Sequence, residues 1–166
     1  MAKNVDKDVP EGFDVQVGRE LGDGWIKKGP NVEVQGRLLG RFIGNQKDDD
    51  GVFQAFYQIR IDKPVSAVRK NRENNETEEI MLEPGQILNV GEHKALEDLS
   101  PRTRDGGVYD VWFKYIDQQK VPNSKRTFWS VKGPRLKVIK APTHAPLPEA
   151  TKRGTGNVVE DGDIPF

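Results

Sequence analysis

Two aromatic residues lie among polar neighbours in segments whose hydrophobic residues alternate. Within residues 52–61, Phe56 falls on the side that carries two glutamines and Arg60. Trp112 falls opposite the apolar side of its own segment, next to Lys114. Proteins hold single-stranded nucleic acid by stacking bases on aromatic rings and pairing phosphates with cations. Phe56 and Trp112 are therefore predicted to stack bases, with Arg60 and Lys114 as phosphate partners, and burial of each ring under a loop or helix is the alternative.

Further cations extend this prediction. Arg37 and Arg41 flank Leu39 in an alternating segment and are expected on its outward side, where they form a basic stripe. The loop 117–126 adds three more predicted contacts to nucleic acid, namely Lys120, Lys125 and Arg126. A charged loop that serves only solubility is the alternative. Of the adjacent pair Phe128 and Trp129, alternation leaves open which ring is exposed.

The sequence gives no sign of a catalytic, metal or cofactor site. The two histidines, His93 and His144, lie far apart, and there is no cysteine. Three consecutive aspartates at 48–50 lack the alternating spacing of a calcium loop. We therefore expect a protein that is not an enzyme and that binds neither metal nor cofactor.

The chain ends in an acidic run closed by an aromatic residue, Asp161-Gly162-Asp163-Ile164-Pro165-Phe166. The Phe side chain and the free α-carboxylate together suit an apolar pocket with a basic rim on a partner protein. Packing of this tip back onto its own domain is the alternative. The tip resembles that of bacterial single-stranded DNA-binding (SSB) proteins. The resemblance implies a docking peptide, formed by Asp161, Asp163, Ile164, Pro165 and Phe166, that recruits replication, repair and recombination enzymes.

Alternation and Gly/Pro punctuation predict five strands and one helix. The segment 31–43 is a long strand whose Gly36 and Gly40 allow bending. The polar segment 63–79 is predicted to form a protruding hairpin arm. The remaining expected elements are strands at 52–61, 86–90 and 108–116, a short helix at 93–99 that Ser100-Pro101 ends, and a fifth strand at 127–131 and 136–139 broken by Gly133-Pro134.

Three strands, a short helix and two strands is the order of the OB-fold, a five-stranded Greek-key barrel. We therefore expect an all-β protein of this fold, with the helix between the third and fourth strands. Ligand should then lie across the second and third strands and the loops joining strands one to two and four to five. The expected domains are an acidic segment 1–24, the OB-fold domain 25–140, and a disordered tail 141–166.

Composition and charge fit one globular domain of mildly basic character. At 166 residues with 34% hydrophobic residues, the chain has material for one core. The overall charge is zero, yet residues 25–140 carry 21 basic and 16 acidic side chains, so the body has a net charge of +5. A mixed-sign solvated surface is the alternative to a phosphate-binding one. No apolar run suits a membrane span or secretory signal, so a cytoplasmic protein is expected.

The predicted function is nonspecific binding and protection of single-stranded DNA, with enzyme recruitment through the tip. The body departs from the SSB pattern, because it lacks the Gly- and Asn-rich opening of the first strand and has the acidic segment 1–24 before it. These departures favour a divergent version from a bacteriophage or mobile element, and the SSB tetramer is not carried over. The alternative is an interaction or inhibitor protein that mimics the SSB tail without binding DNA.

Overall fold

The computed structural model describes residues 22–47, 51–71 and 73–148. Within these ranges the protein is mostly β-sheet, with a single short 3₁₀ helix, η1 (Lys94–Thr103). The strands are β1 (Gly24–Ile26), β2 (Glu33–Lys47), β3 (Phe53–Ile61), β4 (Val65–Lys70), β5 (Thr77–Leu82), β6 (Ile87–Gly91), β7 (Val108–Lys120) and β8 (Thr127–Lys140). The predicted all-β class is thereby confirmed.

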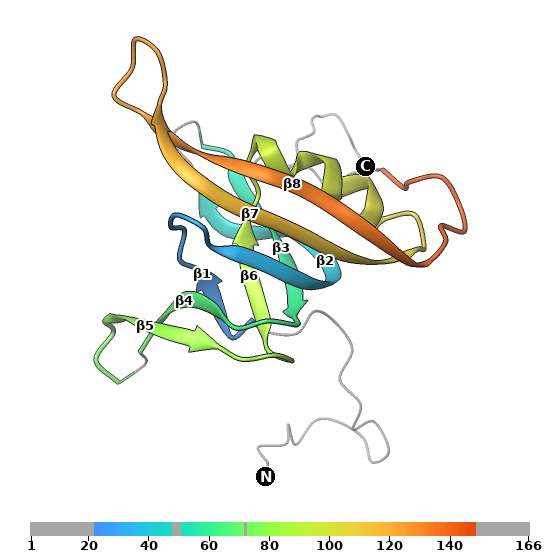
Figure 1. Cartoon of the computed structure of the whole chain (residues 1–166), viewed down its shortest axis with the longest axis horizontal. Helices are drawn as coiled ribbons and strands as arrows, with labels where there is room; N and C mark the ends of the chain where they lie inside the picture. Colours follow the sequence, from blue (N-terminus) through green and yellow to red (C-terminus); the bar gives the residue numbers. More distant parts are fainter. Residues whose placement is uncertain (1–21, 48–50, 72, 149–166) are drawn as a thin grey trace, which may run out of the picture.

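All of these strands join one sheet in the order β5-β4-β1-β6-β3-β2-β7-β8. The sheet is open, with β5 and β8 at its edges, and does not close into a barrel. Short β1 pairs parallel with β6 and antiparallel with β4, and it thus occupies the free side of β6. Figure 1 shows β7 and β8 as a long twisted hairpin across the top, with β4 and β5 at the lower left.

The strands expected from alternation are present, and three details differ from the prediction. The arm at 63–79 is a hairpin of β4 and β5, but through β1 it belongs to the same sheet. β8 runs through Gly133 and Pro134 without a break, and Gly133 has a φ of +96°, which glycine tolerates. The helix also passes through Ser100 and Pro101 before it ends at Thr103.

Gly36 allows β2 to lie close against β3. A Cβ at this position would collide with the carbonyl oxygen of Arg60 and come within 2.7 Å of the Cα of Ile61. Gly36 was expected to let the strand bend, whereas the structure shows a glycine required by close backbone approach. The inward side chains of the strands build one core beneath it, in which Tyr57, Ile59, Phe113 and Tyr115 are fully buried.

A buried ion pair connects β2 with the start of η1. Arg41 donates from Nε to Glu92 Oε2 at 2.9 Å and from Nη2 to Oε1 at 3.0 Å. Both side chains are almost completely buried, at 3% and 2% exposure. The hydroxyl of Tyr57 lies 2.5 Å from Glu92 Oε2 and 3.1 Å from the carbonyl of Leu96 in η1. The predicted outward position of Arg41 in a phosphate-binding stripe is therefore wrong.

Residues 141–148, which the sequence predicts to be part of a disordered tail, contact the body. The amides of Thr143 and His144 donate to the carbonyl of Asp105 at 2.9 and 3.3 Å. The amide of Leu147 donates to the carbonyl of Arg104 at 2.9 Å, and the Arg104 guanidinium donates to the Leu147 carbonyl. Residues 149–166 lie outside the described ranges. The domain boundary expected at Trp25 falls inside β1. The Asp23 amide donates to the Ile87 carbonyl, and the Asp23 carboxylate accepts from the Ile87 amide, so the folded body already includes Asp23.

We predict that Arg41→Gln lowers the free energy of unfolding by about 3–5 kcal/mol, because it removes the cation that faces a buried carboxylate. Arg37→Gln is the matched control on the same strand. The ion pair of Arg37 with Asp110 is 41% and 23% exposed, so its loss should cost only about 0–1 kcal/mol. Urea denaturation followed by circular dichroism measures both values, and similar losses in the two variants would contradict the structural role of Arg41.

Candidate nucleic-acid interface

The outward side of β2, β3, β7 and β8 gathers cations around one tryptophan. Residues directly opposite in antiparallel strands share a face of the sheet. Register places Arg60 opposite Arg37, Trp112 opposite Arg135, and Lys114 opposite Lys132. We call this surface the basic face; its members are Arg37, Arg60, Trp112, Lys114, Lys132, Arg135 and Lys137, with the carboxylates Glu33 and Asp110 among them.

Like charges stand directly opposite each other twice on the basic face. Arg37 faces Arg60 across β2 and β3, and Lys114 faces Lys132 across β7 and β8. Such cross-strand pairs are destabilising by themselves. Asp110 partly offsets the first pair through a 2.7 Å contact with Arg37 Nε. Six cations against two carboxylates still leave an excess of positive charge on this surface.

Trp112 is half-buried at the centre of the basic face. Its indole N–H donates to Glu33 Oε2 at 2.6 Å, which fixes the orientation of the ring. This hydrogen bond lowers the pKa of Glu33, and the nearby ammonium of Lys63 at 3.6 Å lowers it further. Glu33 therefore stays ionised and holds the ring among the cations. Of the two predicted stacking residues, Trp112 is the one on a polar, partly exposed surface.

Phe56, the other predicted stacking residue, is only 6% exposed. Its ring packs against Trp25 at 5.1 Å and Phe42 at 5.8 Å between centroids. Trp25 on β1 covers this side of the sheet and is itself 44% exposed. The expectation of an exposed Phe56 is therefore wrong, because a short strand that alternation did not reveal supplies its cover.

The expected ligand path across the second and third strands is also partly covered. Gln58 on β3 and Asn89 on β6 both point outward but are buried, and the Gln58 amide donates to Asn89 Oδ1 at 3.1 Å. A Cβ on Gly22 would collide with the Asn89 side chain, so the chain before β1 lies directly on it. On these two strands Arg60 stays exposed, and the other exposed cations of this surface lie mainly on β8.

The β7–β8 hairpin carries the positive charge of the body. Residues 108–140 have eight basic and two acidic side chains, an excess larger than the +5 of the whole body. The predicted loop residues Lys120, Lys125 and Arg126 are all exposed near the hairpin tip. Figure 1 shows this loop projecting from the sheet at the upper left. Long strands and an extended loop thus present the cations away from the core.

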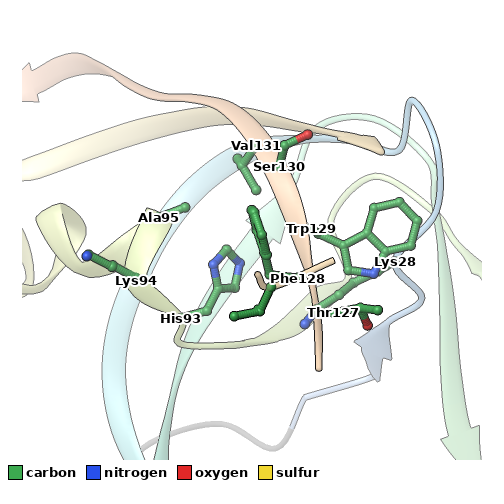
Figure 2. Close-up of a pocket in the computed structure, with 10 residues that line it drawn as sticks. Lys28, His93, Lys94, Ala95, Thr127, Phe128, Trp129, Ser130 and Val131 are labelled. Atoms are coloured by element: carbon green, nitrogen blue, oxygen red, sulfur yellow. The ribbon is translucent and has the colours of Figure 1, made fainter. Parts of the chain in front are cut away.

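A pocket lies where the hairpin crosses the start of η1. It has a volume of about 580 Å³, and we call it the hairpin pocket. Figure 2 shows its lining side chains arriving from the chain after β1, from η1 and from β8. They include Lys28, His93, Lys94, Phe128, Trp129 and Val131. Phe128 is 45% exposed, whereas Trp129 is partly buried with its ring edge-on to Tyr115 at 6.3 Å.

His93 contributes a neutral ring to the hairpin pocket. Burial, the largest cause, and the positive charge of Lys28 together lower the pKa of His93 to about 4, against the opposing effect of Glu92. The ring nitrogen Nε2 lies 3.3 Å from the hydroxyl of Tyr115. At neutral pH the imidazole is therefore uncharged, and the charge at the pocket comes from the lysines.

Sequence reasoning missed Trp25, Lys28 and the pocket. Lys28 follows a strand too short for a recognisable pattern, and the pocket joins segments about 100 residues apart. The docking residues Asp161, Asp163, Ile164, Pro165 and Phe166 lie outside the described ranges. Among the described residues there is no cluster of three potential metal ligands and no helix long and apolar enough to cross a membrane.

We predict that His93 makes stability depend on pH. Its pKa is lower in the folded state than the ordinary value of 6.5, so the unfolded chain binds more protons between these values. Folding stability from this group is therefore fully present above about pH 6.5 and falls as the pH is lowered toward 4. Urea midpoints of wild type and His93→Gln between pH 7 and 4.5 measure the difference.

The control is His144→Gln, which replaces the other, exposed histidine. Carboxylates whose pKa values are lowered by folding, such as Glu33, are common to all three proteins, so the comparison isolates His93. His93→Gln should show the shallowest decline. Parallel pH profiles for the three proteins would contradict the prediction.

Comparison with protein-family models, with curated proteins and with solved structures finds no match to this chain. Geometry and charge are therefore the basis on which a function is assigned to the basic face and the hairpin pocket.

Proposed function

We propose that this protein binds single-stranded DNA with little sequence preference, in the manner of SSB proteins, through its basic face. The observation that carries the proposal is the set of six cations and two carboxylates around the half-buried Trp112. Phosphates would neutralise the opposed pairs Arg37–Arg60 and Lys114–Lys132. The tryptophan offers a ring on which a base stacks.

The order of the strands supports a relation to the OB-fold. The strands expected from sequence are consecutive neighbours in the order β6-β3-β2-β7-β8, and OB-folds are partly open barrels that bind oligonucleotides. We propose an OB variant in which β1, rather than the last strand, lies beside β6. A sheet left open in this way keeps the long β7–β8 hairpin free to contact an extended ligand.

The C-terminal tip adds the second half of the proposal. Its resemblance to SSB tails supports recruitment of replication, repair and recombination enzymes to the bound strand, in the cytoplasm of a bacterium that hosts the phage or mobile element. The tip and the basic face have opposite charges and separate tasks. The tip holds an enzyme, and the basic face holds DNA.

Binding of fluorescent oligo-dT to the full chain tests the DNA-binding half. We expect much tighter binding to oligo-dT than to duplex, with affinity that falls as salt rises. Trp112→Ala should weaken binding by about 1–3 kcal/mol through lost stacking. Arg135→Gln should reduce the salt dependence by about one phosphate contact.

Lys70→Gln is the charge control, because Lys70 is exposed on the β4–β5 arm at the other end of the sheet. Its affinity should match that of wild type. Absence of oligo-dT binding at low salt would overturn the proposal in favour of an interaction or inhibitor protein. Equal affinity for duplex and single strand would overturn it as well. Melting temperatures of the variants separate lost binding from lost folding.

Deletion of Ile164–Phe166 tests the recruiting half. The shortened chain should lose the enzymes that a bacterial lysate supplies to the immobilised wild-type protein, because the phenyl ring and α-carboxylate enter the partner together. Amidation of the terminus should mimic much of this loss by removing the charge. Oligo-dT affinity should not decrease. Recovery of the same enzymes with the deleted chain would contradict the docking role.

A further inference from the structure

The hairpin pocket and the basic face use the two faces of the same edge strand, because Val131 lies opposite the buried Tyr115 whereas Lys132 lies opposite Lys114. One strand supplies both features, since β8 passes from Phe128 and Trp129 at the pocket to Lys132 and Arg135 on the basic face. Phe128 and Lys132 are four residues apart, which is about 13 Å along a strand. Because β8 is a free edge of the sheet, a single strand of nucleic acid on the basic face reaches the pocket by passing around this edge.

The pocket has the chemistry of a nucleotide site. Its walls are mostly aromatic and aliphatic, from Phe128, Trp129 and Val131, and the uncharged His93 ring adds to them. Lys28 and Lys94 supply positive charge, and none of the described residues that line the pocket carries a carboxylate. A volume of about 580 Å³ lies within the usual range for small-molecule sites, roughly 300–1,000 Å³.

The aromatic side chains are suited to hold a flat ring. Trp129 is fixed by its edge-on contact with the buried Tyr115, so little side-chain freedom is lost when a ligand enters. Phe128 is 45% exposed although it lies beside the pocket. A base that packs against Phe128 would cover this exposed surface.

We propose that the hairpin pocket takes up one unstacked nucleotide of the bound single strand, with its base against Phe128 and Trp129 and its phosphate near Lys28 and Lys94. This inference rests on the proposed function and names a second contact point for the same ligand. The basic face holds the backbone of the strand, while the pocket holds one base out of the stack. Bases on the two sides of the pocket are consequently separated from each other.

The test compares Phe128→Ala with Trp112→Ala in the full chain, by fluorescence anisotropy with labelled oligo-dT. Phe128→Ala should weaken binding roughly 5- to 150-fold, the equivalent of one stacked base. Met81→Ala is the matched control, because Met81 is similarly exposed but lies on β5. Phe128→Tyr keeps a stacking ring and should retain affinity, and this variant guards against effects of Phe128→Ala on folding.

An oligomer of the same length built from abasic deoxyribose phosphate separates base from phosphate. Phe128→Ala should leave its affinity unchanged, whereas Lys28→Gln should still weaken its binding and reduce the salt dependence. If Phe128→Ala binds oligo-dT as wild type does while Trp112→Ala is weakened, the pocket proposal fails and the DNA-binding function stands. If wild type binds neither oligomer at low salt, the proposed function itself fails.

Discussion

The buried ion pair between Arg41 and Glu92 connects the sheet to the start of η1, which forms one wall of the pocket. Glu92 ends the connection from β6, Arg41 comes from β2, and Tyr57 of β3 brings the carbonyl of Leu96 in η1 into the same network. Removing charges from water is costly, and only close, two-pronged hydrogen bonding offsets that cost. Once Glu92 is held in this way, His93 and Lys94 follow directly at the start of η1. The positions of both pocket side chains therefore depend on an interaction inside the core.

The basic face and the hairpin pocket both include residues of β8. β8 is an edge strand, exposed along most of its length, and the hairpin that it forms with β7 carries more positive charge than the remainder of the body. Cations on an edge strand hinder pairing with the edge of another sheet. In the proposed function, the same cations attract the phosphates of the bound strand. Protection of the edge and attraction of an anion are thus achieved by the same side chains.

Alternation of hydrophobic residues predicted the long strands well, because inward and outward side chains differ along β2, β3 and β7. It could not reveal β1, whose three residues are too few to form a pattern. It could tell that Phe56 lies opposite the main core but not that Trp25 covers it. The prediction that Arg41 points outward was wrong for a related reason, since its partner Glu92 lies 51 residues away in the sequence. The outward positions predicted for Arg37 and Trp112 were therefore right, because their neighbours on β7 and β8 are polar. The outward positions predicted for Arg41 and for an exposed Phe56 were wrong, because distant segments fold over the sheet there.

The contacts of residues 143–147 with Asp105 and Arg104 set the length of a tether. Had the chain left the body at Ala141, 25 residues would follow that point, whereas only 19 follow Leu147. Nineteen residues span at most about 65 Å when fully extended. If the tip holds a partner as proposed, that partner stays within this distance of the body, and its local concentration near a bound strand is correspondingly high. In the proposed function, each residue fixed against Asp105 and Arg104 would shorten the distance over which a recruited enzyme searches for its substrate.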